Sequence, residues 1–465
     1  MVGAVAVALA VMAGAGLLIS APWADDGGPG ATPGTATSGT ATSGTATSGT
    51  TTAVAPPPSD ATWVSASGDD TGTGTQAQPW RTLAHAVRTA PEGSRIAVRE
   101  GNYEPFTVDR AGLSIASAPG ERATIQGRAG VRDVVLVAAD NVVLSDLTVA
   151  GCVPNANPNV NVPGDHGSGI RVHRTNRVSV RNVIVRDSHG VNAAGLPVGC
   201  YGILATESRD LLVASSEVFH NGGGIHIAGG GRGVVVEQNN VHDQDVILQN
   251  SRQSLDDFGG YGLGATAITD KPGPTFRSNT VLRNFGPSTD YGFDGGGMEI
   301  YDAANTTITG NTFADNDGTL ETGTGSKGRC ADNVFSDNTV TGRSGAGGPA
   351  KYTGLVLRCA SNMAIRNNTF VNVDRFVFLY ESGGAFSGAV DGLQVVGNTV
   401  TQQRGAVVHR LQFGTGKAPE MSVDENRYQA IQDRFAVIGT GPSEATVSFS
   451  EWKSRTGLDA RSTTS

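Results

Sequence analysis

Short stretches in which hydrophobic and polar residues alternate recur along most of the chain. The segment Gly295 to Asp317, GGGMEIYDAANTTITGNTFADND, contains two of them, MEIYD and TTITGNTF, separated by AAN. Alternation with a period of two predicts β-strands, and the polar stretches between them predict turns. Comparable strand pairs return at intervals of roughly 27 to 39 residues, a period typical of solenoid proteins. The pattern therefore predicts a stack of similar coils with loops of variable length inserted at the corners.

An asparagine recurs at the same place in the predicted coils. The positions are Asn240, Asn279, Asn311, Asn338, Asn368, Asn398 and Asn426. Strands of neighbouring coils lie about 4.8 Å apart, so a buried Asn can hydrogen-bond to the Asn of the next coil. We predict a buried asparagine ladder of this kind; the alternative is that these residues mark exposed turns.

The repeated segments NTTITGNTFADN, NMAIRNNTFVNV and LQVVGNTVTQQ resemble the right-handed parallel β-helix superfamily. Its members include pectate and alginate lyases, polygalacturonases, other glycosidases and mannuronate epimerases. The resemblance extends from about Ala61 to the C-terminus and implies an all-β, right-handed parallel β-helix. It also implies a secreted, carbohydrate-active protein, but it does not identify the reaction, because one fold hosts many activities.

The chain divides into three parts by composition. Residues 1–24 are rich in Ala, Val, Gly and Leu and end in SAPWADD, which predicts a secretory signal peptide, or a signal anchor if the segment is not cleaved. Residues 25–60 repeat SGTAT and end in TTAVAPPPSD, a composition that predicts a flexible linker. Residues 61–465 form the predicted β-helix domain. We therefore expect an extracellular or cell-surface protein, with membrane contact only if the first segment remains attached.

The ends of a coil stack expose unpaired strand edges, which we expect short helices to cover. At the N-terminal end, Trp80, Leu83, Ala84 and Val87 fall on one face of a predicted helix. At the C-terminal end, the segment TVSFSEWKSRTGLDARS resembles the closing element of many β-helix enzymes, which implies that Trp452 packs on the last coil.

Composition and charge narrow the class of protein further. The 465 residues include 65 Gly and only 17% charged residues, which suits a turn-rich β protein. The net charge of −9 argues against nucleic acid as a partner, because nucleic-acid binding needs a basic surface. We expect a monomer whose partner is an extracellular polysaccharide.

The four cysteines of an exported chain predict two disulfide bonds. Cys330 and Cys359 lie at similar distances before Asn338 and Asn368, so we expect them to stack on adjacent coils and to be bridged. Cys152 and Cys200 form the other expected pair. Free buried thiols are the alternative.

One strand of each coil carries most of the chemically reactive side chains. Inward positions hold apolar pairs such as Met298 with Ile300, so the residues between them must point outward. The outward positions are rich in His, Tyr, Arg and carboxylates, which is typical of a sugar-binding groove. In this alignment we place one of the strands at Ala265 to Asp270.

Glu299 and Glu321 occupy the same outward position of what we take to be adjacent coils. Two carboxyl groups this close cannot both ionise freely, and a glycosidase needs one protonated and one charged carboxyl group. We predict that this pair supplies the acid and the nucleophile or base, and that Tyr301, Asp302 and Asp270 orient or replace them. The residues expected to bind sugar units are Arg171, His173, His226, Lys271, Asp294, Arg358 and Tyr380.

Two other functions remain open from the sequence. A polysaccharide lyase or uronate epimerase would use Tyr301, His226 or Lys271 as the base, with Arg358 or Ca²⁺ neutralising the uronate. A non-catalytic, cell-surface glycan-binding β-helix would need neither a catalytic base nor a cation that neutralises a uronate. Hydrolysis requires no cofactor and no metal, whereas Ca²⁺ belongs to the lyase alternative. We expect His220 and His242, at recurring turn positions, to be structural.

Overall fold

The computed structural model describes residues 61–159, 162, 164–252, 257–290, 292–325, 330–342, 353–373, 375–381, 387–401, 409–413, 420–431, 434–439 and 444–465. The predicted signal segment, residues 1–24, and the predicted linker, residues 25–60, lie outside this range. Within it, no helix is long and apolar enough to cross a membrane.

The described residues form three long sheets of 13 strands each. Sheet 1 contains β1 (Thr62–Val64), β2 (Arg95–Val98), β5 (Ser114–Ser117), β8 (Val143–Ser145), β11 (Ser179–Arg181), β16 (Leu212–Ala214), β19 (Val235–Glu237), β22 (Thr275–Arg277), β27 (Thr307–Thr309), β30 (Val334–Ser336), β33 (Ala364–Arg366), β36 (Leu393–Val396) and β39 (Met421–Asp424). Sheet 2 contains β4 (Phe106–Val108), β7 (Asp133–Val137), β10 (Ser168–His173), β15 (Tyr201–Ser208), β18 (Gly223–Gly230), β21 (Tyr261–Thr266), β26 (Gly296–Tyr301), β29 (Gly318–Gly323), β32 (Thr353–Leu357), β35 (Arg375–Glu381), β38 (His409–Phe413), β41 (Ala436–Ile438) and β42 (Ala445–Val447). Sheet 3 contains β3 (Gly101–Tyr103), β6 (Ala123–Gln126), β9 (Thr148–Ala150), β12 (Ile184–Arg186), β17 (Glu217–Phe219), β20 (Asn240–His242), β23 (Thr280–Leu282), β28 (Thr312–Ala314), β31 (Thr339–Thr341), β34 (Thr369–Val371), β37 (Thr399–Thr401), β40 (Arg427–Gln429) and β43 (Thr463–Thr464).

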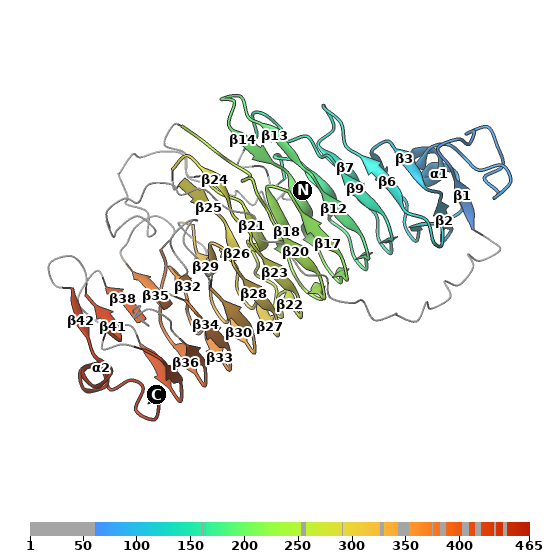
Figure 1. Ribbon diagram of the computed structural model, residues 1–465. Helices are drawn as coiled ribbons and strands as arrows, with labels where there is room; N and C mark the ends of the chain where they lie inside the picture. Colours follow the sequence, from blue (N-terminus) through green and yellow to red (C-terminus); the bar gives the residue numbers. More distant parts are fainter. Residues whose placement is uncertain are drawn as a thin grey trace, which may run out of the picture.

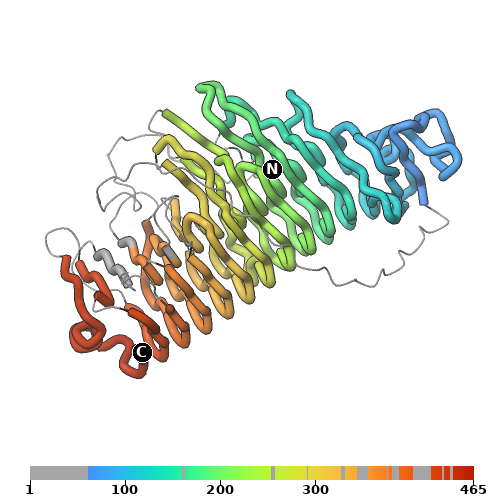
Figure 2. The backbone as a smooth tube through the Cα atoms, viewed as in Figure 1, coloured from blue at the N-terminus to red at the C-terminus, as the bar shows by residue number. Residues whose placement is uncertain are grey.

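Each complete coil contributes one strand to each sheet, and the coils stack into a right-handed parallel β-helix (Figures 1 and 2). At the C-terminal end, β42 adds to sheet 2 by pairing antiparallel with β41. From β10 the chain passes to β11 in sheet 1, to β12 in sheet 3, and then to β15, which pairs in parallel with β10. Two short hairpins are inserted between a sheet 3 strand and the following sheet 2 strand: β13 (His189–Val191) with β14 (Pro197–Gly199), and β24 (Gly286–Ser288) with β25 (Gly292–Asp294). Both hairpins therefore lie along one edge of sheet 2.

A continuous asparagine ladder runs along the corner between sheets 1 and 3, as predicted. Asn311, for example, donates from its side chain to Oδ1 of Asn338 at 3.0 Å and to the Phe276 carbonyl at 3.0 Å. The ladder residues are Asn239, Asn279, Asn311, Asn338, Asn368, Asn398 and Asn426. The predicted member Asn240 is therefore wrong by one residue: the buried amide belongs to Asn239, whereas Asn240 is the first residue of β20.

Left-handed backbone at the residue before the ladder makes this corner sharp. Ser278, Asp337 and Asn367 have φ between +54° and +57°. Short polar side chains tolerate this conformation better than apolar ones. The chain can thus turn and present the next residue inward within two positions.

A second, shorter amide ladder supports the corner between sheets 3 and 2. It consists of Asn221, Gln244, Asn284 and Asn316, each accepting or donating side-chain hydrogen bonds with the next. This ladder, which the sequence analysis missed, fixes the corner from which the chain enters sheet 2.

The space between the sheets is filled by Val, Ile, Leu and Phe side chains. Phe313, Phe335 and Phe370 follow one another along the stack, with ring centroids 5.9 and 6.3 Å apart. Such packing is the main favourable term for a fold whose coils contact only their neighbours.

Helices close both ends of the core, as predicted. Helix α1 (Leu83–Thr89) buries Leu83, Ala86 and Val87. Helix α2 (Phe449–Thr456) begins with a capping box between Ser448 and Glu451. Its Trp452 is completely buried, and the indole nitrogen donates to Asp459 at 2.8 Å.

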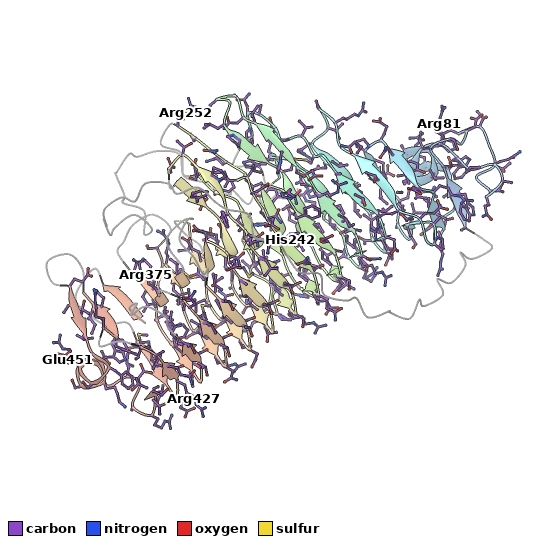
Figure 3. All side chains as sticks on the ribbon, viewed as in Figure 1. Arg81, His242, Arg252, Arg375, Arg427 and Glu451 are labelled. Carbon is purple, nitrogen blue, oxygen red and sulfur yellow. A yellow bond between two sulfur atoms is a disulfide. The ribbon has the colours of Figure 1, made fainter. Side chains whose placement is uncertain are left out.

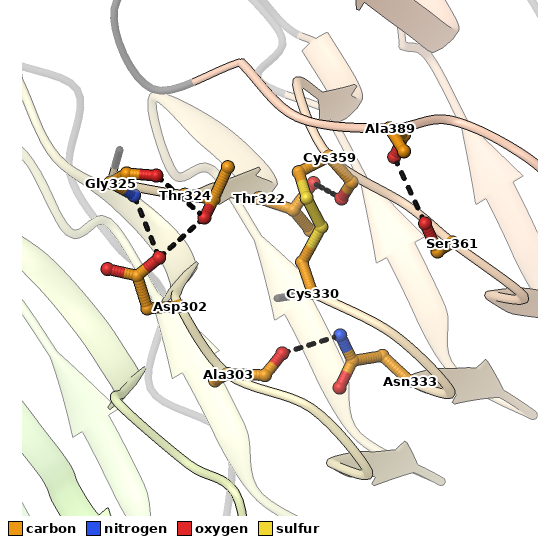
Figure 4. The surroundings of a disulfide bond; sticks show 10 residues. All are labelled: Asp302, Ala303, Thr322, Thr324, Gly325, Cys330, Asn333, Cys359, Ser361 and Ala389. Atoms are coloured by element: carbon orange, nitrogen blue, oxygen red, sulfur yellow. Dashed lines mark hydrogen bonds between the residues drawn. A yellow bond between two sulfur atoms is a disulfide. The ribbon is translucent and has the colours of Figure 1, made fainter. Parts of the chain in front are cut away.

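Both expected disulfide bonds are present. Cys330 and Cys359 join neighbouring coils, with Cα atoms 5.8 Å apart (Figure 4). Cys152 and Cys200 form the second bond, with Cα atoms 6.2 Å apart. Neither bond involves a residue of the candidate site described below.

Candidate functional site

Glu299 and Glu321 face each other across neighbouring strands of sheet 2. In the parallel pairing of β26 with β29, Glu299 is the direct register partner of Glu321. Adjacent parallel strands lie about 4.8 Å apart, so the two side chains leave the sheet side by side. Their flanking residues Met298, Ile300 and Leu320 are buried, which directs both carboxyl groups to the outer face.

Glu321 is held by two neighbours. Tyr301 donates a hydrogen bond from its hydroxyl to Oε1 of Glu321 at 3.0 Å, and Nε of Arg358 lies 2.8 Å from the same oxygen. The side chains of Arg358 and Glu321 are only 11% and 19% exposed. Arg358 follows the end of β32, so the three residues come from three consecutive coils. This ion pair compensates the negative charge of Glu321 and fixes its orientation.

The absence of a side chain at Gly323 makes room for Tyr301. A Cβ atom at this position would lie 2.5 Å from Cε1 of Tyr301. The Tyr301 ring therefore lies over the backbone of the next strand, which brings its hydroxyl to Glu321.

Glu299 borders a cluster of buried aromatic groups on its other side. Its register partner on β21 is Gly264, where a Cβ would lie 2.2 Å from Nδ1 of His226. The hydroxyl of Tyr261 and Nδ1 of His226 are hydrogen-bonded at 2.8 Å. Thus Gly264 leaves the space that the rings of His226 and Tyr261 occupy.

Burial keeps this cluster uncharged at neutral pH. It lowers the pKa of His226 to about 4. Burial also raises the pKa of Tyr201 to about 12, and the charge of Glu299 adds to this effect. The pKa of Tyr261 is raised well above its usual value, first by burial and then by Tyr201 and Glu299. A neutral, hydrogen-bonded wall therefore stands next to Glu299.

The predicted position of Asp270 is wrong. The strand expected at Ala265 to Asp270 is β21, Tyr261–Thr266, and Asp270 lies in the turn that follows. There Arg209 forms hydrogen bonds to both carboxylate oxygens at 3.1 and 3.3 Å, which holds the pKa of Asp270 below its usual value. Asp270 is therefore part of an ion pair at a corner, outside the row that contains Glu299.

Asp302 lies directly after β26 and forms hydrogen bonds to the neighbouring coil. One of its carboxylate oxygens accepts hydrogen bonds from the Thr324 hydroxyl and from the Gly325 amide at 2.8 Å (Figure 4). Its contacts are thus with the chain that leaves β29.

The other predicted sugar-binding residues are spread along the molecule. Arg171 belongs to the same row as Glu299 but lies four strands away, roughly 19 Å. It is buried and pairs with Asp133 at 3.8 Å. His173 shares a 2.7 Å hydrogen bond with Thr206, and burial, followed by the charge of Arg171, lowers its pKa.

Three further predicted residues have different surroundings. Asp294 ends the β24–β25 hairpin, and its charge contributes to the raised pKa of Tyr261, which places it near the aromatic cluster. Lys271 is 78% exposed and pairs with Asp332 at 3.6 Å, at a corner rather than on the face of sheet 2. Tyr380 belongs to β35, but its side chain lies outside the described residues.

The sequence analysis missed the contributions of Tyr201, Gly264 and Gly323 to the site. A signal was available for the tyrosines, since Tyr201 and Tyr261 both begin a Tyr-Gly-hydrophobic stretch at the start of a sheet 2 strand. The glycines carried no such signal, because their importance depends on rings from neighbouring coils.

Comparisons with known proteins agree with the architecture. The family described as right handed beta helix region matches residues 168–349 and 288–426, and a family of unknown function, DUF1565, matches residues 66–118. No curated protein matches the sequence.

Several solved structures are similar to this one at low sequence identity. The catalytic unit of a GH87 α-1,3-glucanase from Streptomyces thermodiastaticus is 16% identical, with a TM-score of 0.53, covering 89% of this chain and 70% of the other. The A-module of a mannuronan C-5 epimerase from Azotobacter vinelandii is 16% identical, with a TM-score of 0.51, covering 86% and 96%. A GH136 lacto-N-biosidase from Eubacterium ramulus is 12% identical, with a TM-score of 0.50, covering 79% and 67%. These similarities establish the fold alone.

Proposed function

Since this chain belongs to the right-handed β-helix family, whose long sheets display side chains in rows, we propose that it is a glycoside hydrolase acting on an extracellular polysaccharide. The observation that carries the proposal is the register pairing of Glu299 with Glu321 on the outer face of sheet 2. Hydrolysis of a glycosidic bond needs two carboxyl groups, one protonated and one charged.

The surroundings of the pair support different roles for the two residues. Arg358 and Tyr301 both contact Oε1 of Glu321, so we assign Glu321 as the charged nucleophile or base. Glu299 lies between Glu321 and the neutral cluster around Tyr261, so we assign it as the proton donor. The close spacing of the two strands favours the retaining mechanism, in which the carboxyl groups are about 5–5.5 Å apart.

An extended substrate fits the arrangement of the other residues. The row of sheet 2 that contains Glu299 also contains His226 and Arg171, and His173 lies two residues further along β10. We propose that the sugar units on the N-terminal side of the cleaved bond follow the direction of this row. The two disulfide bonds support secretion, because such bonds persist in oxidising compartments. Hydrolysis by this pair requires no cofactor.

The lyase or epimerase alternative has weaker support from the site. Arg358 already pairs with Glu321, Tyr301 donates to the same carboxylate, and Lys271 points away at a corner. Among the described residues, the predicted bases Tyr301 and Lys271 each pair with a carboxylate, and His226 is buried beside Tyr261.

The test incubates the full chain with neutral glucans and with uronate polymers, with and without chelator. Reducing ends and the absorbance of unsaturated uronates are followed together. We expect reducing ends without this absorbance, and a loss of activity of at least about 100-fold in Glu299→Gln and in Glu321→Gln. Glu207→Gln serves as the matched control, because Glu207 lies on β15 of the same sheet but pairs with Arg174 at the surface.

Other outcomes would replace the proposal. Unsaturated products, abolished by chelator, would identify a lyase. Binding of a polysaccharide without any product would identify a glycan-binding protein. Full activity in both Gln variants would exclude the carboxylate pair as the catalytic centre.

A further inference from the structure

His189, His220 and Asp245 come together at the corner between sheets 3 and 2. One nitrogen of each imidazole and one oxygen of the carboxylate all lie within 4.8 Å of one another. Nε2 of His189 is 2.7 Å from Oδ1 of Asp245, and Nδ1 of His220 is 2.8 Å from Oδ2. The three side chains are partly exposed, so an ion from solvent can reach them.

The three residues belong to three consecutive coils. His189 begins the β13–β14 hairpin after β12, His220 directly follows β17, and Asp245 follows β20. Backbone hydrogen bonds hold these turns in register: the Ser188 amide donates to the His220 carbonyl at 2.8 Å, and the His220 amide donates to Asp243 at 3.0 Å. The cluster is thus fixed by the coil stacking and does not depend on a flexible loop end.

The backbone of His220 adds to this arrangement. Its φ of +53° lies in the left-handed region, as at the equivalent corner residues Asp187 and Asp243 of the neighbouring coils. Its ring packs against Phe219 at a centroid distance of 5.2 Å and meets the ring of His189 at 6.0 Å, nearly edge to face. The ring is therefore held with Nδ1 directed at Asp245.

We propose that His189, His220 and Asp245 form a binding site for a divalent transition metal ion. Zn²⁺ is the ion that fits the site best. Zinc binds imidazole nitrogen and carboxylate oxygen at about 2.0–2.2 Å, so two of its ligands lie about 3.4 Å apart. The present separations, from 2.7 Å to at most 4.8 Å, bracket this value, and small side-chain movements admit the ion. Three protein ligands leave one position of a tetrahedral zinc for water.

Ca²⁺ and Mg²⁺ fit this cluster poorly. Both ions prefer oxygen donors, and two of the three donor atoms here are nitrogens. A bound zinc would link three successive coils beside the β13–β14 hairpin. This proposal is independent of the glycosidase proposal, because none of its residues belongs to the site around Glu299.

The test adds zinc chloride to the full chain without a polyhistidine tag, after dialysis against chelator. Bound zinc is measured by elemental analysis, affinity by competition with a chromophoric chelator, and the melting temperature with and without the ion. We expect one zinc per chain and a higher melting temperature with zinc than with calcium.

Matched variants separate this site from other histidines. We expect His189→Ala/His220→Ala to lose the bound zinc, and Asp245→Asn to weaken zinc binding at least about tenfold. His242→Ala is the control: His242, labelled in Figure 3, ends β20, the strand that precedes Asp245, and pairs instead with Asp243 and Glu217. It removes one imidazole and should leave zinc affinity unchanged.

Three results would overturn the proposal. The native chain could fail to bind zinc at 100-fold molar excess, or the double His variant could retain the zinc. The third is that His242→Ala loses as much zinc as Asp245→Asn. Circular dichroism in the presence of chelator confirms that each variant is folded. A variant that is unfolded is replaced by His189→Gln, to which the same criteria apply.

Discussion

Tyr301 and Glu321, on neighbouring strands of sheet 2, are joined by a 3.0 Å hydrogen bond from the phenol to Oε1 of the carboxylate. The bond exists because Gly323 leaves the space in which the Tyr301 ring lies. It makes Tyr301 a positioning residue for the carboxylate to which we assign the charged role.

Replacement of Tyr301 by Phe removes the hydroxyl that donates this hydrogen bond. We expect kcat to fall about 10- to 100-fold with little change in KM, because a hydrogen bond to a charged group contributes about 1.5–3 kcal/mol. Steady-state kinetics on the polysaccharide identified by the activity test would measure this. Tyr103→Phe is the control, since Tyr103 lies on β3 at the N-terminal end of the stack, many coils from Glu321, and donates to the Arg99 carbonyl. Equal activity of Tyr301→Phe and the native protein would contradict the assignment.

Replacement of Arg358 by Gln should destabilise the fold. The variant leaves the mostly buried Glu321 without its cation, at a cost of about 3 kcal/mol. Urea unfolding would measure the change in the free energy of unfolding. The double variant Arg358→Gln/Glu321→Gln removes both charges and should recover part of the loss. If Arg358→Gln unfolded at the same urea concentration as the native protein, the ion pair would not contribute to the stability of the fold.

Asn240, the first residue of β20, and Asn239 just before it allow a direct test of the asparagine ladder. Asn239 is buried and hydrogen-bonded to Asn279 and to the Val213 carbonyl, whereas Asn240 is partly exposed. We expect Asn239→Ala to lower the free energy of unfolding by about 2–3 kcal/mol, because buried backbone and side-chain groups lose their partners. Asn240→Ala should change it by less than about 0.5 kcal/mol. Similar values for the two variants would show that the ladder does not stabilise the fold.

Two buried histidines predict a loss of stability in mild acid. Burial lowers the pKa of both His166 and His226 to about 4, below the value of 6.5 expected in the unfolded chain. The unfolded state therefore binds more protons between these values, so their contribution is complete above pH 6.5 and is lost as the pH falls toward 4. At pH 5 each histidine should cost about 2 kcal/mol relative to pH 7.5.

Guanidinium unfolding at pH 7.5 and pH 5 measures this effect. In His226→Gln the difference in the free energy of unfolding between the two pH values should shrink by about 2 kcal/mol. A difference as large as that of the native chain would mean that His226 is protonated in the folded state.

The sequence by itself determined the repeating architecture. The strand alternation, the recurring asparagines, and the pairing of Cys330 with Cys359 all follow from short-range patterns that repeat in each coil. The same alternation placed Glu299 and Glu321 on the outer face, and the short distance between them in sequence allowed their pairing to be predicted.

The tertiary structure decided what depends on the length of the corner loops. The position of Asp270 was predicted incorrectly because the long insertion before β21 shifts the strand by several residues relative to its neighbours, which strand periodicity cannot register. The contacts of Tyr301 over Gly323, of His226 with Tyr261, and of His189 with Asp245 join residues 22 to 56 positions apart. Such contacts arise because stacking brings the same part of each coil above the next, whatever the number of residues between them.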